Sequence, residues 1–289
     1  MLISIVNAHV KASFAAKGAE LQSLVHKQFG INYLWNGDPA YWAKHSPILF
    51  PIVGALKNDS YEFEGKTYQL PRHGFARDLD FDYEKIGQDE IRFTLTQSEE
   101  TLKVYPFEFK LTVTYKLKGC GLACTYEVVN PAAKPLLFSI GAHPAFTVPL
   151  NEQGNYEDYF LQFNKDEQIT YHHIEENLIS PNTSTVPLNN GELGLTHALF
   201  YEDALVFKGL KSDCVSLINH KNYNGINFDF KEFPYFGIWA AKDANFVCLE
   251  PWCGIADAVD HDQQLMHKEG IVTLAPQEKW KRCWQVTCF

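Results

Sequence analysis

The sequence predicts an antiparallel β protein. Short runs rich in Val, Ile, Phe, Tyr and Thr recur along the 289 residues and are separated by turn residues. Apolar and polar residues alternate within these runs, as they do in strands with one buried face. Hydrophobic residues make up 46% of the chain and aromatic residues 14%, enough for a large core. These observations favour one large β-sandwich, a single domain over residues 1–289.

Three segments illustrate the strand pattern. Residues 109–130 alternate on both sides of "KGCG", which predicts a hairpin with Gly119 and Gly121 in its turn. Residues 90–97 and 60–70 have the same composition and are also predicted to form strands.

Helical signals are few. An acidic N-cap and a proline in the first turn predict a short helix over residues 38–45, and one or two helical turns are expected in "DAVDHDQQLMHKEG". Residues 175–194, "EENLISPNTSTVPLNNGELG", are predicted to form a long loop between strands. No glycine-rich phosphate-binding motif follows a strand, which disfavours nucleotide-binding folds.

Charge and cysteine usage narrow the choice of partners. The formal charge is −10, and no lysine or arginine cluster is present to neutralise a row of phosphates. Nucleic acid and membrane surfaces are therefore not expected as partners, and no apolar run approaches the length of a membrane span. The seven cysteines fall in apolar runs and are expected to be reduced thiols of a cytoplasmic protein. Whether the chain is a monomer or a homodimer stays open.

Ionisable residues that interrupt apolar strand-like runs are the candidates for chemistry, because an unpaired buried charge is costly. In "PRHGFARD", His73, Arg77 and Asp78 lie in one compact turn where they could converge on a ligand. For this motif alone, a surface turn with an Arg–Asp pair is the favoured interpretation. In "SIGAHPAF", Pro144 places His143 near a strand end. Alone, His143 is best explained as a hydrogen-bonded core histidine.

The segment "FVCLEPWCGIAD" carries the strongest signal. Glu250 follows four apolar residues and precedes Pro251 and Trp252, so its carboxylate is expected at the end of a buried strand. A glutamate there must be paired, protonated or functional. Trp252 offers a flat apolar face of the kind that stacks on sugar rings. "HHIEE" and "DAVDHD" lack metal-ligand spacing and are expected to be solvated segments, so no metal site is predicted.

Four motifs together, "YWAKHSPILFPIVG", "RHGFARD", "GAHPAF" and "CLEPWCGIAD", resemble the galactose mutarotase-like aldose 1-epimerase family. The resemblance spans essentially the whole chain. It is to the LacX-type branch and, more distantly, to the glucose-6-phosphate 1-epimerases. It implies a β-supersandwich, and a sugar epimerase that needs no cofactor and holds one hexose.

The resemblance also implies roles for individual residues. By position, His143 is the acid that protonates the ring oxygen and Glu250 is the base that takes the anomeric hydroxyl proton. His73 would help to hold the ring oxygen or nearby hydroxyls, and Arg77 would be a hydrogen-bonding or phosphate-facing partner. Asp203 corresponds to an acidic substrate-binding residue.

The sequence leaves the substrate open. "HGFARD" is closer to the phosphosugar branch, whereas Ala55 stands where LacX-type relatives often have arginine. A hexose 6-phosphate would need a cationic pocket from Arg77, Lys44 or Lys57. The aromatic candidates for a sugar platform are Trp35, Phe146, Trp239 and Trp252, and the last two are favoured over core packing. A catalytically silent carbohydrate-binding β-sandwich is the alternative from another class.

Overall fold

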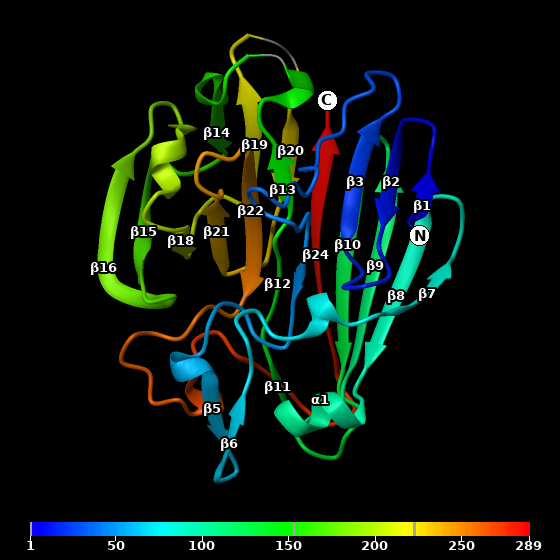
Figure 1. The fold of residues 1–289 in the computed structure, drawn as a ribbon, viewed down its shortest axis with the longest axis vertical. Coiled ribbons are helices and arrows are strands. Elements are labelled where there is room, and N and C mark those ends of the chain that lie inside the picture. The colour runs from blue at the N-terminus through cyan, green and yellow to red at the C-terminus, as the bar shows by residue number, and fades with distance from the viewer. Residues whose placement is uncertain (1, 153, 222–223) are drawn as a thin grey trace.

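The computed structural model describes residues 2–152, 154–221 and 224–289, and strands dominate these ranges (Figure 1). Two large antiparallel sheets confirm the predicted all-β class. In the described ranges, the larger sheet has nine strands in the order β17 (Glu192–Gly194), β14 (Tyr159–Phe163), β19 (Cys214–Asn219), β20 (Ile226–Asp229), β24 (Lys279–Cys288), β10 (Gly121–Val129), β9 (Lys110–Lys118), β8 (Glu90–Thr96) and β7 (Asp82–Lys85).

The second sheet carries the candidate site. Within the described residues, its eight strands include seven in the order β16 (Leu178–Pro187), β15 (Gln168–Glu175), β18 (Leu205–Lys208), β21 (Tyr235–Trp239), β22 (Phe246–Cys253), β12 (Ile140–Ala142) and β4 (Ile48–Leu49). The eighth strand, β13 (Ala145–Thr147), also pairs with β22. In Figure 1 the β15–β16 hairpin forms one lateral edge of the molecule, and β7 lies at the opposite side.

Smaller elements surround the two sheets. Three short sheets consist of β1 (Ile3–Val6), β2 (Val10–Phe14) and β3 (Leu21–His26); β5 (Ser60–Phe63) and β6 (Lys66–Gln69); and β11 (Leu136–Phe138) and β23 (Val272–Leu274). The helices are α1 (Glu99–Val104) and the 3₁₀ turns η1 (Lys57–Asp59), η2 (Ala76–Asp78), η3 (Leu150–Glu152), η4 (Tyr156–Asp158), η5 (His197–Phe200) and η6 (Leu265–His267). Among the described helices, none is long and apolar enough to cross a membrane.

The core lies between the two large sheets. Phe228 on β20 contacts Phe146 on β13 and Phe236 on β21, with ring centroids 5.7 and 6.3 Å apart. Phe146 and Phe236 thus point from the smaller sheet into the core. Because strand side chains alternate between faces, their neighbours in sequence point to the other face of that sheet. Phe146 therefore packs in the core and is not a sugar platform. Trp35 is also buried, and its ring lies 4.8 Å from that of Phe246.

Several predicted elements are confirmed. β9 and β10 form the expected hairpin, with Gly119 in a left-handed conformation in its turn. The segments predicted as strands at 90–97 and 60–70 correspond to β8 and to the β5–β6 hairpin. The helical turn expected within 257–270 is η6.

Two predictions were wrong. Residues 38–45 form no helix; one turn closes on the carbonyl of Asp38, after which Trp42 packs against His143. The predicted loop at 175–194 is largely strand, because β15 and β16 form a hairpin around the left-handed residues Glu176 and Asn177. Pro181 is tolerated in β16 because that strand is at the edge of its sheet.

The structure also contains a helix that was not predicted, α1. Its signal in the sequence is an N-terminal capping box. Ser98 accepts a hydrogen bond from the backbone of Thr101, whose side chain accepts one in return. Two glutamates then follow Ser98 in the first turn, where negative charge is favoured.

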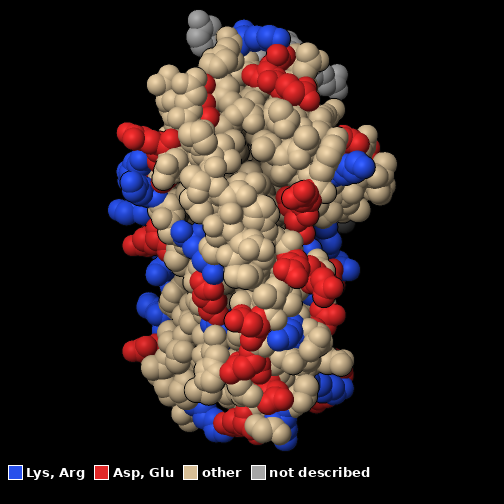
Figure 2. Space-filling view, turned by 90° about the vertical axis from the view of Figure 1, so that its left-hand side faces the viewer, with Lys and Arg blue, Asp and Glu red and all other residues tan. Residues whose placement is uncertain are grey.

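The distribution of charged side chains on the surface agrees with the excess of acidic over basic residues in the sequence. The face shown in Figure 2, over the β15–β16 side, has acidic and basic side chains interspersed around a broad uncharged area.

Candidate active site

The register of β22 with its neighbours brings His143 and Glu250 together. Gly141 pairs with Trp252 and Ala145 pairs with Cys248, so the break between β12 and β13 places His143 opposite Glu250. Directly opposed residues on antiparallel strands point to the same face. The Nε2 of His143 lies 3.3 Å from the Oε2 of Glu250, and both side chains are almost fully buried.

Trp252 lies on the same face as Glu250, two residues further along the strand. Its indole ring lies across the sheet because the two neighbouring strands have glycine beneath it. A Cβ added at Gly237 would be 2.5 Å from the Cη2 of Trp252, and one added at Gly141 would be 2.5 Å from Cδ1. The ring thus fills the space that side chains at these positions would take.

Aromatic rings hold the imidazole of His143 on three sides. Trp42 stacks on it, with centroids 4.9 Å apart and planes at 29°. Trp239 and His73 meet it edge to face, at 5.7 and 5.8 Å. This packing fixes the orientation of the imidazole and removes water from it.

A cavity of about 520 Å³ opens over these residues. Its floor is the outer face of the smaller sheet, with Ile179, Ile174 and Val206 from β16, β15 and β18. Its walls come from the turns around residues 72–77 and 200–204. A cavity of this volume, lined by apolar and aromatic groups with a few polar ones, is the usual form of a small-molecule site.

The turn after β6 supplies the polar wall. His73 and Gly54 are tied by two hydrogen bonds, from the His73 amide to the Gly54 carbonyl (2.9 Å) and from the Gly54 amide to Nδ1 of His73 (3.1 Å). Arg72 donates from Nε to His73 Nε2 (3.2 Å) and from Nη1 to the side-chain oxygen of Asn177 (2.9 Å). Both nitrogens of His73 therefore face N–H donors, so an imidazolium, which has no acceptor, is disfavoured.

Burial shifts the acid/base pair in opposite directions. It lowers the pKa of His143 to about 3, and the nearby Arg72 charge adds to the fall. It raises the pKa of Glu250 well above its usual value; Arg72 opposes the rise and Asp203 adds to it. Burial also lowers the pKa of His73 well below its usual value, with help from Arg72. Burial therefore favours Glu250 over His143 as the holder of the proton that the two side chains share.

The structure brings most of the predicted site residues to this cavity. His73, Arg77, Asp203, Trp239 and Trp252 all line it, together with His143 and Glu250. Asp203 accepts a hydrogen bond from the backbone of Ala204. Arg77 donates to the carbonyl of Arg72 (2.8 Å), so it supports the turn as well as lining the cavity.

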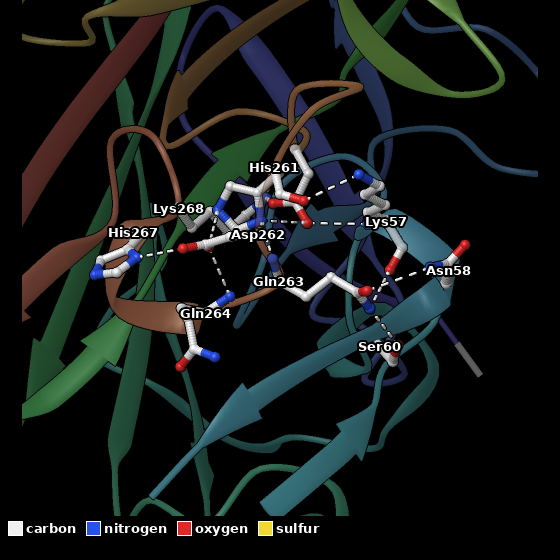
Figure 3. A network of polar contacts seen from close by, with 10 residues as sticks. Lys57, Asn58, Ser60, His261, Asp262, Gln263, Gln264, His267 and Lys268 are labelled. Atoms are coloured by element: carbon white, nitrogen blue, oxygen red, sulfur yellow. Dashed lines mark hydrogen bonds and ion pairs between the residues drawn. The ribbon is translucent and has the colours of Figure 1, made fainter. Parts of the chain in front are cut away.

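Lys44 and Lys57 lie outside the cavity lining. Lys44 pairs with Asp78 at 3.2 Å. Lys57 donates to the carbonyl of His261 (3.1 Å) within the polar network of Figure 3.

Asp257, expected in a solvated segment, is instead buried in the same network. Its carboxylate accepts from Lys268 (2.8 Å), whose side chain is also fully buried, and from the backbone of Lys57 (2.9 Å). A carboxylate that anchors a loop in this way has the same sequence signature as one in solvent, namely an acidic run.

Arg72, Asn177 and Trp42 are among the cavity residues that sequence reasoning missed. Arg72 stands in the quoted motif "PRHGFARD" beside His73, so the signal was available. Trp42 stands in "YWAKHSPILFPIVG", but it was assigned to the helix predicted over residues 38–45 and was therefore not considered as a site residue. Asn177 could be found only once the β15–β16 turn was known.

Comparison with known proteins identifies the family. The family model described as "Aldose 1-epimerase" matches residues 1–283. The chain belongs to the aldose 1-epimerase family. It is therefore an isomerase-type enzyme, and its fold neighbours agree with that assignment.

Relatives cover this epimerase from end to end. It is 33% identical to the chromosomal protein LacX of Lactococcus lactis subsp. lactis, over 99% of both chains. The crystal structure of a galactose mutarotase related enzyme from Lactobacillus acidophilus superposes with a TM-score of 0.95, at 36% identity, over 100% of this chain and 97% of that one. A provisionally named glucose-6-phosphate 1-epimerase of Escherichia coli (strain K12) is 32% identical over 48% of this chain and 49% of its own.

Proposed function

We propose that this epimerase interconverts the α and β anomers of a free aldohexose by acid/base opening and closing of the ring. The observation that supports this most is the pair of His143 and Glu250, 3.3 Å apart at the floor of a cavity large enough for one sugar. One side chain that gives a proton and one that takes a proton are what the reaction requires.

The proposed reaction conserves protons at every step. Glu250 takes the proton of the anomeric hydroxyl while His143 gives a proton to the ring oxygen, and the bond between C1 and the ring oxygen breaks. The product is the open-chain aldehyde, with Glu250 protonated and His143 neutral. Rotation about the C1–C2 bond presents the other face of the aldehyde, and the reverse transfers close the ring.

Burial stabilises a protonated Glu250 beside a neutral His143. This is the same protonation state that the pair has in the proposed reaction once the sugar ring is open. The reactive ionised form holds the same single proton, moved from Glu250 to His143. The 3.3 Å separation allows that transfer without a carrier.

Polar groups around the pair suit the hydroxyls of a neutral sugar. Arg72, His73, Asn177, Glu202 and Asp203 all line the cavity. Trp239 and Trp252 offer apolar ring faces for the C–H side of a pyranose.

A hexose 6-phosphate is the second candidate, supported by Arg72 and Arg77 in the cavity lining and by the partial match to the Escherichia coli protein. Against it, the acidic side chains of Glu202 and Asp203 line the same cavity. The contacts of Lys44 and Lys57 with Asp78 and with the His261 carbonyl also keep both ammonium groups away from it. We therefore favour the free sugar.

Anomer exchange measured on both substrate types tests the proposal. Freshly dissolved α-glucose and α-galactose, followed by polarimetry, and glucose 6-phosphate, followed by NMR saturation transfer, should give faster exchange on the free sugars. Faster exchange on the phosphosugar would favour the second candidate. Sugar binding without any acceleration would instead indicate a carbohydrate-binding module and would refute the enzyme mechanism.

A further inference from the structure

A third potential ligand atom lies beside the acid/base pair. Cys248 precedes Glu250 by two residues on β22, so both side chains point to the same face of the sheet. One nitrogen of His143, the sulfur of Cys248 and one carboxylate oxygen of Glu250 all lie within 4.8 Å of one another, and all three side chains are buried. The proposed epimerase reaction gives Cys248 no task.

The distances fit a tetrahedral metal ion. Zinc bonds of about 2.0–2.2 Å to nitrogen and oxygen place two such ligands about 3.3 Å apart. The Nε2 of His143 and the Oε2 of Glu250 are already 3.3 Å apart. Zinc–sulfur bonds of about 2.3 Å require the sulfur to lie about 3.5 Å from the other two ligands. From within 4.8 Å, a small rotation of the Cys248 side chain would reach this position.

The surroundings leave one coordination position open. His143 and Glu250 line the cavity, whereas Cys248 does not and is fully buried. An ion entering from the cavity would thus meet two ligands first and the thiol last. Its fourth position would face the cavity, where water or a sugar hydroxyl could occupy it.

We propose that His143, Cys248 and Glu250 form a binding site for a thiophilic divalent cation, Zn²⁺ above all, and that the bound ion inhibits the enzyme reversibly. The ion would take the nitrogen lone pair and the carboxylate that proton transfer needs. Imidazole, thiolate and carboxylate are the three side-chain ligand types that zinc uses in proteins. Binding would release the thiol proton and the proton of the acid/base pair to solvent.

Metal binding can be measured separately from activity. Equilibrium dialysis against Zn²⁺ should show one tight ion per wild-type chain, and Cys248→Ala should weaken that binding at least about tenfold, the low end of the effect of removing even an outer partner of a metal ligand. Co²⁺ should give a thiolate charge-transfer absorption in the wild type that Cys248→Ala removes. Cys253→Ala is the matched control, since Cys253 is a buried free thiol on the same strand but outside the cluster.

Inhibition rests on the proposed function and is the second readout. Zn²⁺ should slow mutarotation by the wild type and by Cys253→Ala, EDTA should restore the rate, and Cys248→Ala should be at least about tenfold less sensitive. Absence of tight Zn²⁺ binding to the wild type, or equal binding by Cys248→Ala, would overturn the proposal. If Cys248→Ala does not fold, His143→Ala serves in the dialysis, and unchanged binding would overturn it as well. Absence of mutarotation with tight binding intact would instead count against the proposed function alone.

Discussion

At the scale of single residues, the proposed catalysis depends on one proton that His143 and Glu250 share. Burial pushes the pKa of Glu250 up and that of His143 down, so the buried pair keeps one proton over a wide pH range. The proposed reaction also needs one proton on the pair. The charge state is therefore set by the burial of both groups between sheet and aromatic rings.

The pH profile of the rate follows from these shifts. Activity should persist as pH falls through 6.5, the ordinary pKa of histidine, because a second proton binds only near the lowered pKa of His143, about 3. It should decline on the alkaline side, as pH rises through the raised pKa of Glu250. Polarimetry of kcat/KM against pH, corrected for spontaneous exchange, checks this. An acid limb near 6.5 would contradict the assigned shifts.

Replacing Glu250 should stabilise the fold. A folded-state pKa above the unfolded one means that the native state keeps a proton that the unfolded chain loses above about 4.5, so wild-type stability falls as pH rises from there. Glu250→Gln removes this penalty while its amide can still donate to His143. Thermal unfolding should thus show a higher Tm for Glu250→Gln at pH 7, with the difference vanishing as pH falls to about 4.5. Each tenfold difference between the acid dissociation constants of Glu250 in the folded and unfolded chain contributes about 1.4 kcal/mol to this difference in stability. A lower Tm for the variant at pH 7 would rule this out.

At the scale of elements, the register in which the strands pair brings the residues of the site together. The apolar run in "FVCLEPWC" correctly predicted a buried strand next to Glu250, but Glu250 lies within β22 and not at its end, because the strand continues to Cys253. The pairing of β22 with β12 and β13 was not readable, because register depends on contacts between segments far apart in sequence. The resemblance to a family supplied that link for His143. It could not supply Cys248, because the thiol looks like any other buried core residue in the sequence.

Gly237, one of the two glycines beneath Trp252, gives a prediction about the packing between strands. Gly237→Ala would place a methyl group 2.5 Å from the indole and push the ring into the cavity. We expect KM for the sugar to rise several-fold, with a smaller change in kcat, since the three atoms nearest to the added methyl group all belong to Trp252. Steady-state polarimetry measures both constants.

Gly194→Ala provides the control for this substitution. Gly194 is also a strand glycine, on β17, and a methyl group there would meet no atom within 4 Å. This variant should retain wild-type KM. Equal effects of the two substitutions would show that the position of Trp252 is not what matters.

At the scale of the whole molecule, segments distant in the chain are held around the cavity by buried polar contacts. Asp257 joins Lys268 on the approach to β23 with the backbone of Lys57, and Gln263 in the same network reaches Ser60 (Figure 3). The class of the fold was predictable from composition and alternation. This network was not, because "DAVDHD" is as polar as a solvated loop and only the fold decides which of its carboxylates is buried.

The buried pair in this network has a measurable cost of disruption. Lys268→Met leaves the Asp257 carboxylate buried without its cation and should lower the free energy of unfolding by about 3–5 kcal/mol. The double variant Lys268→Met with Asp257→Leu should recover part of that loss, since no buried charge then remains. Urea unfolding followed by fluorescence provides the values. A single variant as stable as the wild type would mean that the pair does not hold these segments.

The central claim, that His143 and Glu250 act as one unit on the anomeric centre, is tested most directly by a double-mutant cycle in mutarotation rate. His143→Gln and Glu250→Gln should each lower kcat/KM by roughly 10²–10⁴ while the far-ultraviolet circular dichroism stays that of the wild type. The double variant should be no slower than the slower single variant, because removing either partner already ends the proton exchange. Near-wild-type rates in either single variant, or losses that multiply in the double variant, would contradict it.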